Sequence, residues 1–452
     1  MLGLGDSGYS MTRWLVRQGA RVTALDTRAA PPHLAAARAM NSVTVRTGEF
    51  QRGDFDQTDM IAVSPGLDPR VGELGAAIKR GMPVVGDVEL FAQTISARRD
   101  RPKVIAITGS NGKSTVTAMC GDICTAAGRD TVVAGNYGLP VLDVLDGIDG
   151  GRRMPQVMVL ELSSFQLETT ASLAPDAATL LNLSEDHMAR YDSLADYGAA
   201  KRRIFMGNGV QVLNRDDEFS LQSVVKTQSF ASFGYSAPLS DDEWGLAGDS
   251  KNMQLAHGAQ HLMPVTQLPI AGLHNAANAL AAGALCHAVG VEHDAIVSAL
   301  KAFKGLPHRV QNINKINNIT FYDDSKGTNV GSTVAALNGM PEPVVLIAGG
   351  DGKGQDFSPL APAVAAHARA VVLIGRDGPG IGKVLAGTRV PLIAASDMRD
   401  AVAKAYEAAR AGDAVLLSPA CASYDMYRSY VHRAEVFVAE VRLLAELVRG
   451  RQ

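Results

Sequence analysis

The sequence predicts three consecutive α/β domains, each built around a mainly parallel sheet. Short apolar segments of strand length alternate with amphipathic helical patterns, and this alternation begins anew near Arg101 and again after Leu306. A chain of 452 residues is long enough for about three domains that each bury a core. We therefore expect domains over residues 1–100, 101–306 and 307–452.

Composition and charge favour a protein that acts on small molecules. The 43 basic and 46 acidic residues give a net charge of -3, so the chain lacks the positive field that attracts nucleic acid or an anionic membrane. No apolar segment approaches the roughly 18 residues of a membrane span, and the N-terminus lacks the pattern of a signal peptide. We expect a cytoplasmic protein that neither binds nucleic acid nor inserts into a membrane. Four cysteines are too few for a disulfide framework and are interpreted as reduced packing residues: Cys120, Cys124, Cys286 and Cys421.

The first domain contains strand-like segments at residues 21–26 and 59–66 that end in polar or glycine residues. Ligands of such sheets bind at the carboxyl ends of the strands. The segment GLGDSG at residues 3–8 fits the G-x-G-x-x-G pattern, but that turn should follow a strand and only Met1 and Leu2 precede it. Either the start codon is assigned too far downstream, or the first strand is missing from this chain.

The second domain opens with a buried strand at residues 103–109, the loop TGSNGKST at 108–115, and a helix through Cys124. In this arrangement backbone N–H groups and a helix N-terminus surround polyphosphate. Ile107 stands where the general pattern needs glycine, so the loop is of a shorter type. The loop predicts ATP binding by Gly109, Ser110, Asn111, Gly112 and Lys113, with Mg²⁺ held by a hydroxyl of Ser114 or Thr115.

Further strands at residues 157–164 and 177–184 end in polar residues. Glu161 and His187 follow neighbouring strands, and together they predict a second part of a metal site. On spacing alone, Lys201 is interpreted as a solvated helix lysine. Residues 236–264 are less regular and predict excursions or short antiparallel strands.

The third domain has strand-like segments at residues 321–325, 344–350, 370–375 and 414–419. Their regular spacing resembles a six-stranded dinucleotide-binding sheet without its glycine fingerprint.

The motifs together resemble the Mur ligase family over essentially the whole chain. They are, in chain order, GLGDSG, DTR, SPG, TGSNGKST, GNYGLP, ELSSFQLETT, NLSEDHMARY, AAKRRIF, HNAANALAA, LPHR, DDSKGTN, GGDGKGQDF and SPACASYD. Several are weak alone, but their order is highly specific. GGDGKGQDF and SPACASYD fit the branch that adds D-glutamate, and the DNPR-like signature of the diaminopimelate- and lysine-adding branches is not found.

The resemblance implies a UDP-binding Rossmann-like domain, a central P-loop ATPase-like domain and a C-terminal Rossmann-like domain. It implies that ATP phosphorylates the carboxylate of UDP-N-acetylmuramoyl-L-alanine. The amine of D-glutamate then attacks the acyl phosphate, and a tetrahedral intermediate collapses to the amide. The same resemblance implies a monomer, closure of the last domain around ATP, and a role in peptidoglycan precursor synthesis.

Site roles follow from the resemblance, motif by motif. Lys113 neutralises the ATP phosphates; Glu161 and His187 match metal ligands. Lys201 matches a lysine that the family carbamylates near a second Mg²⁺, which replaces the interpretation from spacing. The other implied residues are Asn136 beside the reacting carboxylate, where the following Tyr137 departs from the usual small residue; Asn278, Arg309 and Asp324 at the nucleotide; Lys326, Thr328, Lys353, Ser423 and Tyr430 at D-glutamate; and Gly5, Asp6, Ser7, Gly8, Asp26, Thr27 and Arg28 at the uridine diphosphate.

Other functions were weighed against this one. A folylpolyglutamate-type ligase shares the short loop but lacks the uridine-binding domain. A nicotinamide-dependent oxidoreductase would use GLGDSG and Asp26, which lies near the usual spacing of a ribose-binding acid. A non-catalytic nucleotide switch would not need Glu161, His187 and Lys201.

Overall fold

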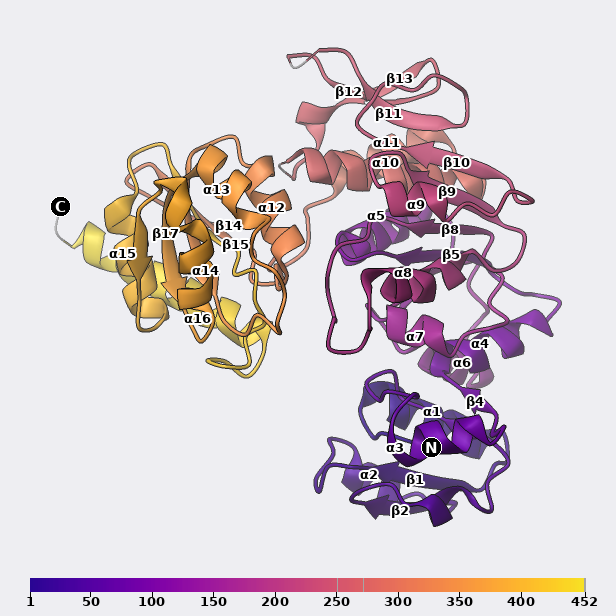
Figure 1. The fold of residues 1–452 in the computed structure, drawn as a ribbon. Coiled ribbons are helices and arrows are strands. Elements are labelled where there is room, and N and C mark those ends of the chain that lie inside the picture. Colours follow the sequence, from indigo (N-terminus) through magenta and orange to yellow (C-terminus); the bar gives the residue numbers. More distant parts are fainter. Residues whose placement is uncertain (250, 271, 451–452) are drawn as a thin grey trace. The chain divides into compact units, whose positions relative to one another are not determined.

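The computed structural model describes residues 1–249, 251–270 and 272–450, and the chain forms two compact units (Figure 1). The first unit consists of Met1–Leu183, Ala195–Leu262 and Ala279–Leu300. The second consists of Ser184–Leu194, Met263–Asn278 and the chain from Lys301 onwards. The domain boundaries expected near residues 101 and 307 stay predictions.

The N-terminal part of the first unit contains two pairs of parallel strands. They are β1 (Val22–Asp26) with β2 (Val43–Thr47), and β3 (Ile61–Ala62) with β4 (Val84–Val85). Leu2 forms parallel bridges with both Leu25 and Val63, and so joins the two pairs at the position where the glycine turn needs a preceding strand. The helices are α1 (Asp6–Arg17), α2 (Leu34–Arg38), η1 (Arg52–Phe55), α3 (Gly72–Lys79) and α4 (Asp87–Ser96).

The central sheet has the strand order β13-β12-β11-β10-β9-β8-β5-β7-β6. Its strands are β5 (Lys103–Thr108), β6 (Thr131–Gly135), β7 (Val157–Glu161), β8 (Ala177–Leu180), β9 (Val210–Asn214), β10 (Phe230–Phe233), β11 (Glu243–Ala247), β12 (Gln254–His257) and β13 (Gln260–Pro264). The strands from β6 across to β11 pair in parallel, whereas β12 is antiparallel to β11. Short strands therefore do occupy residues 236–264, as expected.

The helices in this part of the chain are α5 (Lys113–Ala126), α6 (Val141–Asp149), α7 (Ser164–Glu168), α8 (Leu194–Arg202), η2 (Arg203–Phe205), α9 (Glu218–Gln222), η3 (Val265–Gln267), α10 (Leu273–Ala288) and α11 (His293–Ala302). The predicted helix through Cys124 is α5. All four cysteines are buried and free, and the sulfur atoms of Cys124 and Cys286 lie 3.8 Å apart between α5 and α10. This confirms the interpretation of the cysteines as reduced packing residues.

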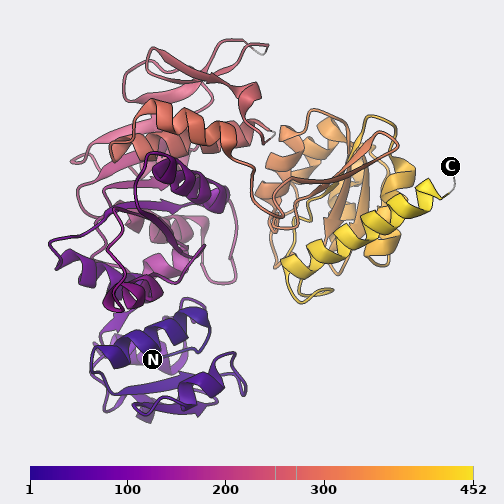
Figure 2. The same cartoon turned by 180° about the vertical axis from the view of Figure 1, so that it is seen from behind.

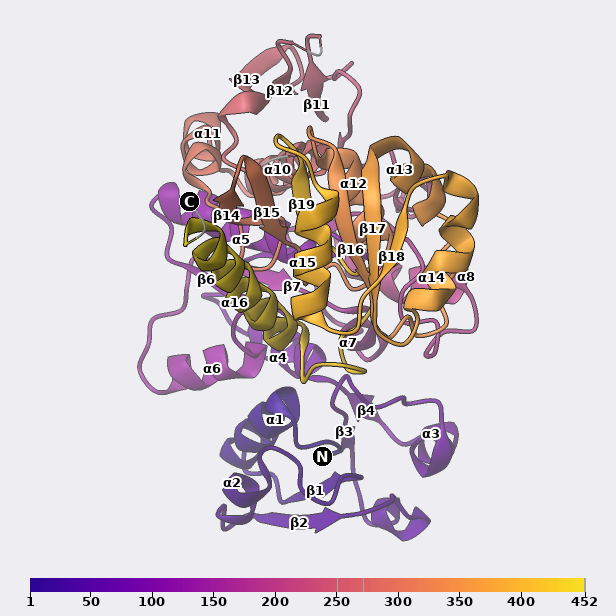
Figure 3. The ribbon, with the colours of Figure 1, turned by 90° about the vertical axis from the view of Figure 1, so that its left-hand side faces the viewer.

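The sheet of the second unit has the order β14-β15-β19-β16-β17-β18 (Figure 3). Its strands are β14 (Gln311–Ile316), β15 (Ile319–Asp323), β16 (Val344–Gly349), β17 (Ala368–Ile374), β18 (Leu392–Ala394) and β19 (Ala414–Leu417), and within the described residues these confirm the expected six-stranded sheet. Only the β14–β15 pair among these neighbours is antiparallel.

Separate apolar cores lie on the two faces of this sheet, which makes it doubly wound. One core packs under α15 (Met398–Ala408) and α16 (Tyr430–Arg449), and Figure 2 shows α16 running along the outside of that face. The other packs under α12 (Val330–Gly339), α13 (Leu360–His367) and α14 (Gly378–Leu385), which is followed by η4 (Ala386–Thr388). Each face of the sheet is thus covered, as the sequence predicted for a Rossmann-like domain.

The glycine turn before α1 provides a matched test of this packing. A Cβ atom on Gly8 would lie 1.7 Å from the carbonyl oxygen of Gly3, whereas one on Gly5 would meet nothing within 4 Å. We expect Gly8→Ala to destabilise the N-terminal part by roughly 1–3 kcal/mol through overpacking, and Gly5→Ala to have little effect. Hydrogen exchange at the β1 amides measures this local stability. Equal protection in the two variants would contradict the packing described.

Candidate active site

The phosphate-type loop connects the central strand β5 to α5. Gly109 has a φ of +151° and Gly112, which caps α5, has a φ of +83°. Both values favour glycine, because a side chain at a positive φ is strained. The helix begins at Lys113, so its first backbone N–H groups are directed towards the loop. The loop therefore has the backbone geometry of an anion site at a helix N-terminus.

Asn182 holds this loop in place from the carboxyl end of β8. Its main-chain oxygen accepts from the Ser110 N–H at 2.9 Å, and its side-chain oxygen accepts from the Asn111 N–H at 2.8 Å. The Asn182 amide group donates in return to the Asn111 carbonyl at 3.1 Å. Sequence analysis missed Asn182, although its place after a predicted strand in NLSEDH was a usable signal.

Two lysines converge on the Gly109 carbonyl oxygen. The Lys113 Nζ donates to it at 2.9 Å and also to the Ser110 carbonyl, while the Lys201 Nζ donates to it at 2.8 Å. Lys201 is only 1% exposed, so the interpretation as a solvated lysine is wrong and the structure places it at the loop. Burying a cation is costly without compensation. Two ammonium groups beside one loop therefore favour a polyanionic ligand.

Glu161 lies at the end of β7, the strand next to β5, and is 2% exposed. Its Oε1 accepts a 2.6 Å hydrogen bond from the side chain of Asn136, which follows β6. Its buried Oε2 has no hydrogen-bond partner among the described residues. A buried carboxylate oxygen left in this way is costly, and a hard cation such as Mg²⁺ would satisfy it. Ser114 and Thr115 are buried and follow Lys113 in the first turn of α5, next to the loop.

The structure thus brings together the loop, Lys113, Lys201, Glu161 and Asn136 at the carboxyl ends of β5, β6 and β7. His187 belongs to the segment Ser184–Leu194 of the other unit. Its φ is +59° and its Nε2 lies 3.6 Å from the Asp186 carboxylate. The metal site that the sequence predicts for Glu161 with His187 stays a prediction.

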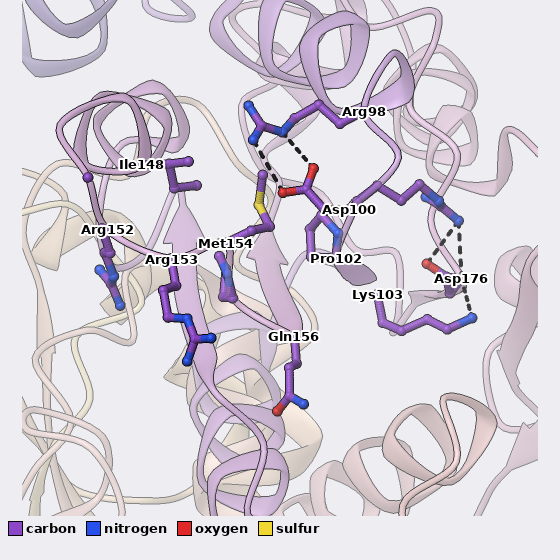
Figure 4. A pocket seen from close by; sticks show the side chains of 13 residues that line it. Arg98, Asp100, Pro102, Lys103, Ile148, Arg152, Arg153, Met154, Gln156 and Asp176 are labelled. Atoms are coloured by element: carbon purple, nitrogen blue, oxygen red, sulfur yellow. Dashed lines mark hydrogen bonds and ion pairs between the residues drawn. The ribbon is translucent and has the colours of Figure 1, made fainter.

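A cavity of about 880 Å³ lies at the opposite, amino-terminal end of these strands (Figure 4). Ion pairs already neutralise much of its charge: Arg98 pairs with Asp100, and both Arg101 and Lys103 pair with Asp176. Lys103 begins β5, so this cavity is separate from the loop that follows the same strand.

At the predicted uridine end, Asp26 is the last residue of β1 and is 2% exposed. Its carboxylate accepts from the Leu4 N–H at 2.7 Å and from the backbone and side chain of Arg28. Burial raises the pKa of Asp26, but these hydrogen bonds outweigh burial and leave it at about 2. Asp26 thus fixes the glycine turn to the strand end. Asp6 makes a 2.7 Å contact with His33, and Ser7 and Gly8 belong to the first turn of α1; Thr27 is exposed.

In the second unit, the candidate residues follow β15, β16 and β19, which are neighbours in the sheet. The Lys326 Nζ lies 4.0 Å above the ring of Tyr430. Lys353 has a φ of +51° in the loop after β16, and that loop pairs with the segment before Ser423 through the Asp351–Ala422 bridge. Thr328 donates its N–H to the Lys326 carbonyl. The residues predicted for D-glutamate therefore lie at the carboxyl ends of neighbouring strands in one sheet.

Arg433 joins two of these strand ends, and sequence analysis missed it. The guanidinium is 1% exposed and donates to Ser325 Oγ at 3.0 Å, to the Ser325 carbonyl at 2.9 Å and to the Cys421 carbonyl at 3.1 Å. Burial lowers the pKa of Arg433 to about 10. Arg433 is a positioning residue, and its place in the first turn of an ordinary helical pattern did not indicate this role.

The nucleotide candidates of this unit are partly grouped. Asp324 is buried, accepts from the Ser418 hydroxyl at 2.7 Å and interacts electrostatically with Arg309. Asn278 lies on α10 and donates to Asn275 at 3.1 Å. Asp324 and Arg309 are thus brought together.

Models of three families match consecutive parts of the chain. They are the Mur ligase MurD-like N-terminal domain at residues 1–86, the Mur ligase middle domain at 107–286, and the Mur ligase glutamate ligase domain at 308–421. A curated relative from Methylobacillus flagellatus is 56% identical over 98% of this chain and 96% of its own length, and one from Thiobacillus denitrificans is 53% identical over the same shares. The chain belongs to the Mur ligase family. Both relatives are named UDP-N-acetylmuramoylalanine–D-glutamate ligase.

Solved Mur ligases share the fold. MurF from Acinetobacter baumannii has a TM-score of 0.61 at 20% identity, covering 87% of this chain and 92% of that one. The UDP-N-acetylmuramate–alanine ligase MurC from Thermotoga maritima has a TM-score of 0.59 at 18% identity, covering 98% of both chains. The Mur ligase architecture expected from the motifs is therefore confirmed.

Asp324 gives the Mur ligase a pH-dependent stability. Burial raises the pKa of its carboxyl from 3.8 to about 7, against the opposing effects of Ser418 and Arg309. The buried site favours the protonated carboxyl. The free energy of unfolding therefore falls as the pH rises from about 4 to about 7. We expect Asp324→Asn to gain stability relative to the unmodified protein between about pH 4 and 7, by up to about 4 kcal/mol. Calorimetric melting at a series of pH values measures the difference, and a difference independent of pH would contradict the assignment.

Proposed function

We propose that this chain is an ATP-dependent ligase that joins D-glutamate to UDP-N-acetylmuramoyl-L-alanine in peptidoglycan precursor synthesis. The observation that carries the proposal is the identity of 50–56% to ligases of that name across 98% of the chain. The loop, Lys113, the buried Lys201 and the buried carboxylate of Glu161 support a site for the ATP that such a reaction consumes. No helix in the described ranges is both long and apolar enough to cross a membrane. On the family resemblance, we also propose that the protein acts in the cytoplasm as a monomer.

The reaction explains why cations surround the loop. Phosphorylation of the L-alanine carboxylate replaces an oxide leaving group with phosphate, which the D-glutamate amine then displaces. The reactants are all anionic, so charge neutralisation and positioning dominate catalysis. We propose that Lys113 neutralises the transferred phosphate. Bound Mg²⁺ would neutralise further charge, held by Glu161 and Ser114 and, as proposed from the family resemblance, by His187.

We further propose that Lys201 is carbamylated by CO₂. Its burial and its place beside Gly109 and Thr108 support this, because a carbamate would offer oxygen ligands to a second Mg²⁺ where the unmodified amine offers only donors. The modification would also remove the buried cation at Lys201. Lys201 is then a metal ligand and Lys113 remains the cation at the phosphates.

The remaining substrates are assigned by strand end. The amino acid is proposed to bind Lys326, Thr328, Lys353, Ser423 and Tyr430; the nucleotide Asn278, Arg309 and Asp324; and the uridine diphosphate the turn from Gly5 to Gly8 with Asp26, Thr27 and Arg28, next to Asn136 at the reacting end.

The nicotinamide alternative is weakened by Asp26. A ribose-binding acid needs carboxylate oxygens that can accept from the ribose hydroxyls. Both oxygens of Asp26 already accept from Leu4 and Arg28. These hydrogen bonds argue against Asp26 as the ribose-binding acid of a nicotinamide site.

Phosphate release tests the proposed reaction. We expect release from ATP only when UDP-N-acetylmuramoyl-L-alanine and D-glutamate are both present, because the acyl phosphate needs the first and its breakdown to amide needs the second. Each substrate omitted singly is the control. Release with a different amino acid but not with D-glutamate would refute the substrate assignment.

The same assay addresses the carbamate. Lys201→Ala should lose activity and partly regain it with added short carboxylates, because an exogenous anion can occupy the place of the carbamate. Failure of this rescue in a variant that still binds ATP would argue against carbamylation while leaving the ligase assignment intact.

A further inference from the structure

Three histidines meet within the first unit, in a part of the chain that the ligase chemistry does not use. His257 ends β12, His287 lies on α10, and His293 begins α11. One ring nitrogen from each lies within 4.8 Å of those of the other two. The Nδ1 of His257 and the Nε2 of His293 approach to 2.9 Å, and the rings of His287 and His293 stack with centroids 4.9 Å apart.

The hydrogen bonds around these rings resemble those of metal-bound histidines. The Nδ1 of His287 lies 3.2 Å from the Val291 carbonyl oxygen, so it carries the proton and leaves Nε2 as an acceptor. His257 hydrogen-bonds the backbone of Asp241. A backbone carbonyl that holds the second ring nitrogen is the usual outer partner of a histidine ligand. Burial lowers the pKa of both His257 and His293, and the neighbouring rings lower it further.

We propose that His257, His287 and His293 form a binding site for a divalent transition metal of the Zn²⁺ class. Three imidazole ligands suit zinc, copper, nickel or cobalt, whereas Mg²⁺ prefers oxygen ligands. Three protein ligands leave a fourth position for water. The site is therefore chemically distinct from the Mg²⁺ site proposed at Glu161.

The geometry needs only small side-chain movements. Zinc–nitrogen bonds of about 2.0–2.1 Å place the ligand atoms of a tetrahedral site roughly 3.3 Å apart. The present upper limit of 4.8 Å requires the rings to close by about 1–2 Å. The 2.9 Å contact between His257 and His293 already needs a proton between two nitrogens. A cation would take the place of that proton, and His293 can carry the proton on its other nitrogen.

A bound metal would join elements that are far apart in the sequence. It would tie the strand β12 to α10 and α11, which are themselves linked by a short turn. The neighbouring Trp244 on β11 pairs with His257 in the antiparallel register, and their rings stack at 4.3 Å. A metal at the histidines therefore lies beside a fluorescent reporter, and Trp14→Phe would leave Trp244 as the only tryptophan because the chain has two.

The test uses the full chain, stripped of metal by a chelator and kept in excess Mg²⁺ so that oxygen-rich sites are filled. Zn²⁺ is titrated against a chromophoric competitor. Co²⁺ is added in parallel because its visible spectrum reports four-coordination, and in the Trp14→Phe background its quenching reports proximity to Trp244. The test variants are His287→Asn and His293→Asn. The control is His261→Asn, an exposed histidine on the adjacent β13, and His187→Asn excludes binding at the ligase site.

We expect one equivalent of Zn²⁺ that His261→Asn and His187→Asn retain and that each cluster variant binds roughly tenfold or more weakly, since even outer-shell changes cost 10–100-fold. Tetrahedral Co²⁺ bands and quenching of Trp244 should disappear in the same two variants. Circular dichroism identifies a variant that fails to fold, and the other variant then decides. No binding, or equal binding in folded cluster variants, would overturn the proposal and leave the histidines as packing around Trp244.

Discussion

The convergence of two lysines on the Gly109 carbonyl oxygen is the interaction on which the site depends. It requires the left-handed backbone at Gly109, the buried strand β5 before it and the clamp from Asn182 behind it. Lys113 reaches this oxygen from its own helix, whereas Lys201 reaches it from α8, more than ninety residues further along the chain. Two positive charges from segments far apart in the sequence therefore lie beside the same loop. Two cations beside one loop favour an anionic ligand there.

Buried charged groups also hold the strand ends of the second unit in place. Arg433 donates hydrogen bonds to the carbonyl and hydroxyl of Ser325 and to the Cys421 carbonyl. It thereby fixes the loops that carry Lys326 and Ser423. Asp324 is held beside them in a site that favours its neutral form. A Mur ligase must order several anionic reactants, and in both units buried charged groups, rather than exposed ones, shape the strand ends. Stability and ligand binding are consequently coupled through the same residues.

The sequence predicted the features that depend on residues close together in the chain. The loop, its helix and the strands of both large sheets follow from apolar segments, glycines and polar strand ends, and Glu161 follows from its place at such an end. Lys201 does not, because its burial depends on how α8 packs on β5; spacing alone indicated a solvated residue, and only the family resemblance corrected it. Asn182, Arg433 and the three histidines depend on contacts between remote segments. The strand expected at residues 59–66 is limited to Ile61–Ala62 with a bridge at Val63, since pairing with β4 is short.

The central claim is that the buried carboxylate of Glu161 is a metal ligand for bound ATP. Calorimetric titration of ATP into Glu161→Gln, with and without Mg²⁺, tests it most directly, with the exposed Glu218→Gln as control. We expect the variant to lose affinity for ATP in Mg²⁺, but to bind metal-free ATP as well as or better than the unmodified protein, because one negative charge has gone. An equal loss of affinity with and without Mg²⁺ would contradict the claim and make Glu161 a structural residue.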